Sequence, residues 1–209
     1  MPRASTIGSA GACPWAAVEY PPARTSAAVR GVRLSEHDEI GADFLRSVRA
    51  RCASLKTRGE QALARLDDAE LTKTLDPESN SVAVLVQHIA GNMRSRWTDF
   101  LTADGEKPDR HRDAEFEPGL TTRALILQRW EEGWRIFFAA LDALKPEDLT
   151  RTVLIRREPL TVVDAINRQL VHYGEHVGQI VYLAKHYKWR TWESLSVPRR
   201  RPADRKEPK

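Results

Sequence analysis

Two histidines one helical turn apart are the residues whose types and spacing most directly indicate chemistry in this sequence. His172 and His176 lie at positions i and i+4, so on a helix both imidazoles project from one face. At about 100° per residue, both fall on one edge of the apolar stripe of their segment and lean toward the protein interior. A buried neutral imidazole has two ring nitrogens to satisfy, and a shared metal ion satisfies one nitrogen of each ring. The pair therefore indicates a candidate metal site.

His88 offers a third ligand from a separate segment, where it lies at the margin of another apolar stripe. Ligands from facing helices can converge on one ion in the core of a helical bundle. Three histidines without a fourth protein ligand leave a coordination position open for water or substrate, which is typical of a catalytic rather than a structural site. The spacing alone leaves an alternative open, in which His172 and His176 are core histidines bonded to carbonyls and His88 is unrelated to them.

The same stretch, residues 172–176, also reads HYGEH and matches H-x-x-E-H, the inverted zinc-protease motif with its glutamate as general base. On a helix Glu175 projects about 60° further from the apolar stripe than His172, toward solvent, which disfavours this interpretation. The sequence contains no phosphate-binding loop, no dinucleotide-binding glycine motif and no C-x-x-C pair. The metal site is therefore the main chemical signal of the sequence.

The elements that must position these histidines are predicted to be helical. Apolar residues recur every three or four positions in four segments, which gives each an amphipathic face. Four such faces cover one another in an all-α four-helix bundle. The segments are approximately 35–66, 81–101, 127–144 and 160–187. A long loop over 102–119 and a short β-branched run at 152–156, either a strand or an extended connector, join the later helices.

Composition supports a single soluble globular domain with irregular ends. The 209 residues are 41% hydrophobic and 30% charged, and no stretch approaches the roughly 18 consecutive apolar residues of a membrane span. We expect a disordered or loosely attached segment over 1–34, the bundle over 35–198 and a basic tail over 199–209. Two cysteines cannot form a disulfide framework and the chain shows no signal peptide, so we expect a cytoplasmic protein.

Charge is unevenly distributed along the chain. Residues 199–209 hold six Lys or Arg against two acids, and residues 1–34 hold four Arg against one Glu. Since the whole chain carries +4, the span 35–198 carries −3. A mildly acidic body lacks the clustered basic face that is usual in DNA-binding domains, so we do not expect a nucleic-acid partner.

The residues around the three histidines carry a resemblance to a known family. His88 on the second predicted helix, followed by His172-x-x-x-His176 on the fourth, is similar to the DinB/YfiT superfamily of metal-binding four-helix proteins, and to one uncharacterised bacterial subfamily of it. The similarity covers about residues 40–198. Its densest blocks are QHIAGNMRSRWTDFLTADGEKP (87–108), RDAEFE (112–117), RWEEGW (129–134) and INRQLVHYGEHVGQIVYLAKH (166–186).

The resemblance implies an up-down-down-up bundle with a long crossover, a divalent metal ion on the three histidines, zinc or nickel, and frequent homodimers. Characterised relatives include enzymes that use a low-molecular-weight thiol such as mycothiol or bacillithiol, as S-transferases or as a maleylpyruvate isomerase. By analogy we expect a metal-dependent thiol S-transferase or hydrolase that acts on a small-molecule thiol or electrophile. The alternative is a non-catalytic, metal-stabilised bundle that serves as a stress-response or ligand-binding module.

Three polar residues lie one or two turns from the histidines on the same helix edges. Asn92 and Arg96 follow His88, and Arg168 precedes His172. If the site binds an anionic thiol cofactor or substrate, these side chains are the candidates to hold it. The alternative is the ordinary polarity of a surface or a bundle end.

Overall fold

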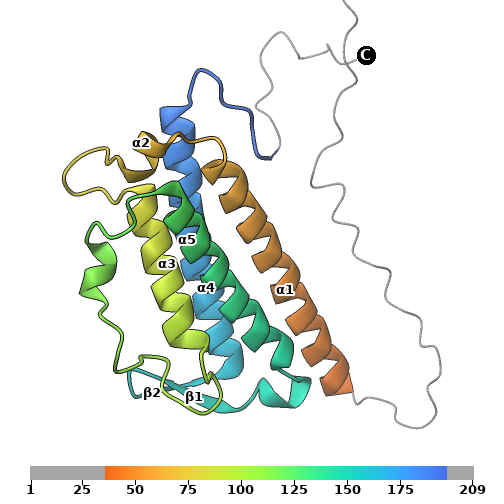
Figure 1. The fold of residues 1–209 in the computed structure, drawn as a ribbon. Helices are drawn as coiled ribbons and strands as arrows, with labels where there is room; N and C mark the ends of the chain where they lie inside the picture. The colour runs from red at the N-terminus through yellow and green to blue at the C-terminus, as the bar shows by residue number, and fades with distance from the viewer. Residues whose placement is uncertain (1–35, 197–209) are drawn as a thin grey trace, which may run out of the picture. The chain divides into compact units, whose positions relative to one another are not determined.

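Four long helices dominate the computed structural model, which describes residues 36–196. They are α1 (Glu36–Leu63), α3 (Val82–Trp97), α4 (Arg123–Ala143) and α5 (Val162–Tyr187). In Figure 1, α1 and α5 run in one direction, and α3 and α4 run in the opposite direction. This is the predicted four-helix bundle with up-down-down-up topology. The predictions for residues 1–34 and 199–209 lie outside the described residues.

The segments that connect the helices explain why α1 is parallel to α5 and α3 is parallel to α4. After a short helix α2 (Asp68–Thr72), which was not predicted, α3 runs antiparallel to α1. A crossover over 98–122 then leads back to the start of the parallel helix α4 and contains the short 3-10 helix η1 (Asp113–Phe116). A second 3-10 helix, η2 (Pro146–Asp148), precedes a two-stranded antiparallel hairpin of β1 (Thr152–Ile155) and β2 (Glu158–Thr161). The β-branched run at 152–156 therefore forms a strand, one of the two conformations considered.

Side-chain caps fix the starts of the helices that carry or flank the histidines. The hydroxyls of Ser81, Thr122 and Thr161 accept hydrogen bonds from backbone N–H groups in the first turns of α3, α4 and α5. Each bond satisfies a donor that has no partner within its helix. The predicted end of the second helix was too late, because α3 stops at Trp97 and Asp99 adopts a left-handed backbone with φ 50°.

An aromatic core joins α3, α4 and α5 below the histidines. Tyr173, fully buried, packs edge-on against Trp134 and Phe137. Its hydroxyl accepts a hydrogen bond from Trp97 Nε1 (2.8 Å) and donates one to Asn92 Oδ1 (3.2 Å). These contacts hold α3 and α5 at a fixed separation next to His172. In the described part of the chain, no helix combines the length and apolarity that crossing a membrane requires.

Candidate metal centre

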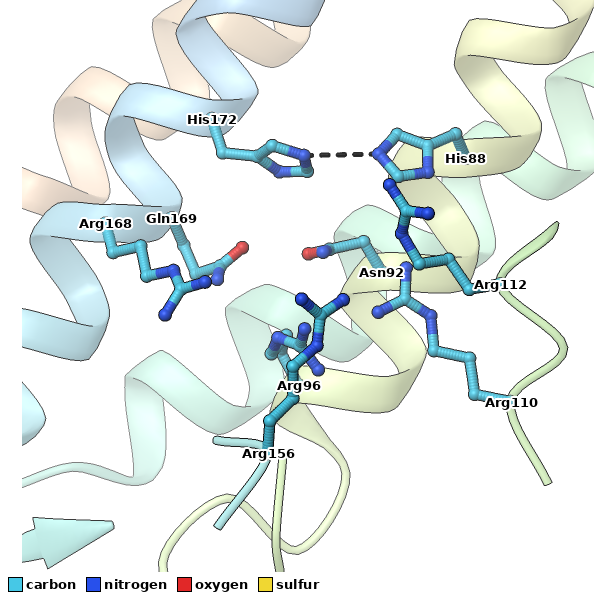
Figure 2. A pocket seen from close by; sticks show the side chains of 9 residues that line it. All are labelled: His88, Asn92, Arg96, Arg110, Arg112, Arg156, Arg168, Gln169 and His172. Carbon is cyan, nitrogen blue, oxygen red and sulfur yellow. Dashed lines mark hydrogen bonds between the residues drawn. The ribbon is translucent and has the colours of Figure 1, made fainter. Parts of the chain in front are cut away.

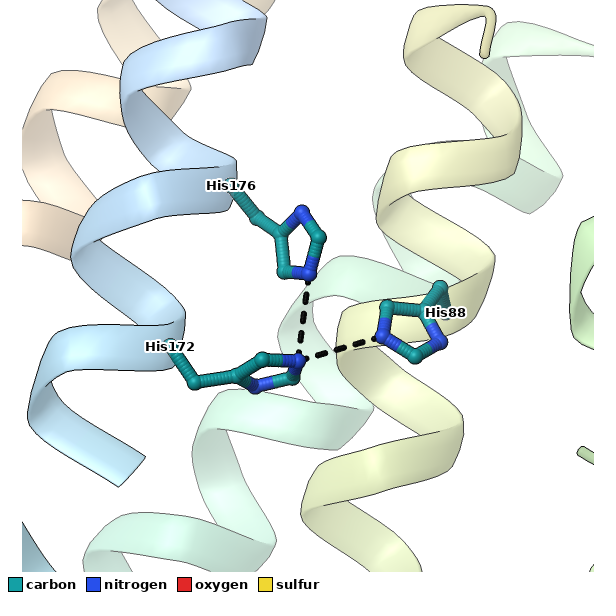
Figure 3. A group of neighbouring side chains, drawn as sticks. All are labelled: His88, His172 and His176. Carbon is teal, nitrogen blue, oxygen red and sulfur yellow. Dashed lines mark hydrogen bonds between the residues drawn. The ribbon is translucent and has the colours of Figure 1, made fainter. Parts of the chain in front are cut away.

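Three imidazoles from two helices meet at one point in the bundle. His88 projects from α3, and His172 and His176 project from α5 (Figure 3). The Nε2 atom of His172 lies 3.2 Å from Nε2 of His88 and 3.1 Å from Nε2 of His176. All three candidate ligand atoms lie within 4.8 Å of one another, and among residues 36–196 no other set of three His, Cys, Asp or Glu converges in this way.

The other ring nitrogens fix the protonation of two of these imidazoles. His88 Nδ1 lies 2.9 Å from Glu115 Oε2, and His176 Nδ1 lies 2.8 Å from Gln179 Oε1. Because both partners are oxygen acceptors, the hydrogen-bond network assigns the proton to Nδ1 in each ring. The Nε2 atoms of His88 and His176 then present lone pairs, and both lone pairs face Nε2 of His172.

Protons cannot satisfy this arrangement fully. A proton on His172 Nε2 can be donated well to only one of the two facing lone pairs. His172 Nδ1 is buried and has no hydrogen-bond partner among the described residues, so the other tautomer of His172 gains nothing there. A divalent cation would accept all three lone pairs. Two ligands of a tetrahedral zinc ion are about 3.3 Å apart for Zn–N bonds of about 2.0–2.1 Å, close to the two observed separations. The donor set therefore fits a metal ion.

Electrostatics keep the α5 histidines neutral. Burial, with smaller contributions from the neighbouring His176 and His88, lowers the pKa of His172 to about 3. Burial likewise holds the pKa of His176 below its ordinary value. A neutral imidazole is the form that binds metal ions, so both rings are ready to bind metal at neutral pH.

Glu115, from η1 in the crossover, is the group that orients His88. Arg110 Nε and Nη2 donate to its two carboxylate oxygens at 2.7 and 2.8 Å, and Gln87 Nε2 donates to its backbone oxygen at 3.1 Å. Burial acts to raise the pKa of Glu115, but the bonds from Arg110 and His88 outweigh burial and the net pKa lies below its usual range. The carboxylate is therefore ionised, as in the carboxylate–histidine pairs that support metal ligands.

The backbone of α3 leaves room for this carboxylate. Gly91 lies one turn after His88, and a Cβ atom there would collide with Glu115. The absence of a side chain at Gly91 thus lets Glu115 approach His88 closely.

The histidine cluster borders a cavity of about 140 Å³ that lies between α3, α5 and the crossover (Figure 2). His88 and His172 form part of its wall. The three polar residues singled out from the sequence, Asn92, Arg96 and Arg168, all line this cavity. The other lining residues are Arg110, Arg112, Arg156 and Gln169.

Glu175 does not take part in this site. Its side chain is exposed, as its angle on the helix predicted, and it lines a separate groove next to Leu75 and Tyr182. The glutamate of the H-x-x-E-H pattern therefore faces away from the cavity, and the third histidine of the cluster comes from α3.

The sequence did not identify several residues of the site. Gln179 follows His176 by three positions on the same helix, a spacing at which side chains interact, so it could have been found. Glu115 and Arg110 come from the crossover, where no periodicity indicates which side chains turn inward. Arg156 lies at the tip of a hairpin far along the chain, and no local signal connects it with the histidines.

This fold and site define a class of protein. An up-down-down-up bundle whose second and fourth long helices present three convergent histidines is the arrangement of DinB/YfiT-like proteins. A family model described as a protein of unknown function, DUF1572, matches residues 39–201. The chain belongs to this DinB/YfiT-like family. A search of curated proteins found no match to the chain.

Proposed function

We propose that this protein is a metal-dependent enzyme in which His88, His172 and His176 bind one divalent ion, zinc or nickel. The observation that carries the proposal is the convergence of three Nε2 atoms at the wall of a cavity. Two of these imidazoles line the cavity, so a ligand in the cavity lies beside the ion. Three protein ligands leave a position open to that ligand.

The reaction class that we favour is transfer of a small-molecule thiol to an electrophile, with hydrolysis as the second choice. A divalent ion at this position would lower the pKa of a coordinated thiol or water. A free thiol has a pKa near 8.5, so it needs less assistance than water does. Among the described residues that line the cavity there is no carboxylate to act as a general base, which favours the thiol. Glu115 keeps His88 oriented, and the arginines of the cavity wall hold anionic groups.

The same lack of a carboxylate in the lining supports a second candidate function. In this alternative the metal ion stabilises the bundle, and the cavity binds a ligand without converting it. A homodimeric assembly and a cytoplasmic location remain predictions under either function.

A turnover panel separates the two functions. Metal-loaded wild type is incubated with several low-molecular-weight thiols and model electrophiles, beside His172→Ala and the matched control His186→Ala, whose histidine is exposed on the same helix. We expect turnover by wild type and His186→Ala, and none above the uncatalysed rate with His172→Ala. Equal rates for all three proteins and the uncatalysed reaction would refute the enzymatic function. Metal content measured on the same samples shows whether the non-catalytic alternative survives.

A further inference from the structure

Positive charge is concentrated in the wall of the cavity beside the histidines. Five arginines from α3, the crossover, the hairpin and α5 line it, namely Arg96, Arg110, Arg112, Arg156 and Arg168. The carboxylates that pair with the two buried arginines are Glu106 and Glu115. Five guanidinium groups therefore share one small space, and the adjoining carboxylates neutralise only part of their charge.

The arginines differ in how far they are already engaged. Arg96 donates to Glu106 at 2.9 Å and to the Gly105 carbonyl, and Arg110 holds Glu115 with two hydrogen bonds. Both are structural partners of the site. Arg168 is exposed at the cavity rim and forms no ion pair with any described residue.

Two further arginines at the rim are only weakly engaged. Arg156 adds a contact to Glu106 at 3.0 Å, a carboxylate that Arg96 already occupies. Arg112 reaches Asp113 at 3.6 Å, and both of those side chains are largely exposed. The rim therefore offers guanidinium groups that remain able to bind an anion.

Buried polar atoms with no partner lie at the same cavity. Gln169 is 4% exposed, its Oε1 atom has no hydrogen-bond partner among the described residues, and its amide points into the cavity in Figure 2. Arg96 is also 4% exposed, and its Nε atom has no partner in the described part of the chain. Unpaired polar groups at such depth are uncommon in native proteins. The Arg96 Nε–H group is a donor and therefore indicates a ligand with acceptor atoms, such as an anion, whereas the Gln169 oxygen is an acceptor that an anion does not satisfy.

A strained turn places one of the rim arginines. Arg156 and Arg157 join β1 to β2 with φ of 56° and 65°, where glycine or asparagine is usual. The Asp104 carboxylate holds this turn by accepting the backbone N–H groups of Arg156 (2.9 Å) and Arg157 (2.7 Å). Backbone strain at a residue that lines a cavity is typical of functional sites. Of the two strained residues only Arg156 lines the cavity, so the turn serves to place that side chain at the rim.

We propose that this cavity binds the dianionic group of a small molecule, a dicarboxylate or a phosphate monoester, through Arg156 and Arg168. The inference rests on the proposed function only in placing the anion beside a metal ion at His88 and His172. The volume of about 140 Å³ is close to that of an engineered cavity that holds benzene, so the bound group is small. The rim arginines and the unpaired Arg96 Nε–H group together form the binding site for that group.

Calorimetric titration with inorganic phosphate and with succinate tests the proposal on the full chain, free of chelator and in both metal-free and metal-loaded form. The variants are Arg156→Gly and Arg168→Gln, and Arg157→Gly is the matched control because it relieves the same turn outside the cavity lining. We expect wild type and Arg157→Gly to bind at least one probe with similar affinity in the metal-free form. Loss of a charge-assisted hydrogen bond should weaken binding about tenfold or more in Arg156→Gly and Arg168→Gln. The tighter probe identifies the kind of dianion.

The outcomes separate this inference from the proposed function. Absence of binding by wild type, or equal affinity in Arg156→Gly, Arg168→Gln and wild type, would overturn the inference. Binding that requires metal and does not change in the arginine variants places the anion on the ion alone, which overturns the inference and supports the metal site. A protein that takes up no metal ion but binds phosphate through Arg156 keeps the inference and overturns the proposed function.

Discussion

The protonation of individual rings determines what the histidine cluster can bind. Glu115 and Gln179 accept hydrogen bonds from the Nδ1–H groups of His88 and His176, which leaves both Nε2 lone pairs directed at His172. A metal ligand whose other nitrogen is held by a carboxylate is more basic and better oriented than a free imidazole. The chemistry of the site thus depends on residues that do not touch the ion themselves.

Glu115→Gln should lower metal affinity about 10- to 100-fold, because the amide loses the charge that orients His88. Affinity is measured by competition with a chromogenic chelator at a temperature where circular dichroism shows the variant to be folded. Glu117→Gln, an exposed neighbour in the same segment, is the control and should bind metal as wild type does. Equal affinities for the two variants would remove Glu115 from the site.

The free energy of unfolding of the metal-free protein should fall as pH drops below about 6.5. His172 stays neutral in the folded state because burial depresses its pKa to about 3, whereas the unfolded chain takes up a proton near its ordinary pKa of 6.5. The unfolded state therefore binds more protons in this window, and acid favours it. Urea unfolding at pH 7, 6 and 5 checks this. His172→Gln should show a flatter dependence, and a slope equal to that of wild type would contradict the assignment.

At the scale of elements, the crossover and the hairpin complete a site that the helices begin. Gln87 on α3 donates to the backbone oxygens of Ala114, Glu115 and Glu117, which fastens η1 beside His88. Asp104 fastens the hairpin turn to the start of the same crossover. Polar side chains thus anchor both irregular segments, in addition to buried apolar residues of the hairpin such as Val153 and Ile155.

Arg157→Gly should raise the free energy of unfolding by about 1 kcal/mol, since a left-handed backbone costs a non-glycine residue about that much. For a chain of this size the midpoint of thermal unfolding should rise by roughly 2–4 °C. Scanning calorimetry of the metal-free protein measures the change. A lower midpoint would show that the Arg157 side chain, and not its backbone, matters to the turn.

Whether an element could be predicted from the sequence depends on whether the contacts that form it are local in sequence. Helical periodicity indicated α3 in advance, because it is local in sequence. The early end of α3 depends on the left-handed Asp99, and aspartate is compatible with either conformation. The inward turn of Glu115 depends on Arg110 and Gln87, contacts that no periodicity encodes. Local sequence patterns thus predicted the helices and the three histidines, whereas the residues that support the histidines could be identified only from the structure.

At the scale of the whole described unit, the metal site joins parts of the bundle that are distant in the chain. His88 on α3 and the α5 pair are separated by more than 80 residues, so a shared ion cross-links two antiparallel helices. The packing of the four helices into a bundle was predictable because each has one apolar face that must be covered. The parallel α3–α4 pair requires the long crossover, and the resemblance to DinB/YfiT-like proteins supplied that expectation.

Removing the ion should destabilise the bundle. A metal ion present at 1,000 times its dissociation constant adds about 4 kcal/mol to the free energy of unfolding, which corresponds to roughly 10 °C in the midpoint. Thermal unfolding is followed with and without a chelator. In the double variant His172→Ala/His176→Ala, chelation should leave the midpoint unchanged. An equal fall in that variant and in wild type would mean that the stabilising ion lies elsewhere.

If imidazoles from α3 and α5 hold the same ion, loss of any one of them should lower the metal content per chain. Wild type and four variants, His88→Ala, His172→Ala, His176→Ala and the control His186→Ala, are purified without a metal-affinity tag and analysed by inductively coupled plasma mass spectrometry. We predict about one zinc or nickel per chain in wild type and in His186→Ala. Loading should fall to a similar extent in the other three. Undiminished loading of His88→Ala would contradict the account, because α3 would then contribute no ligand.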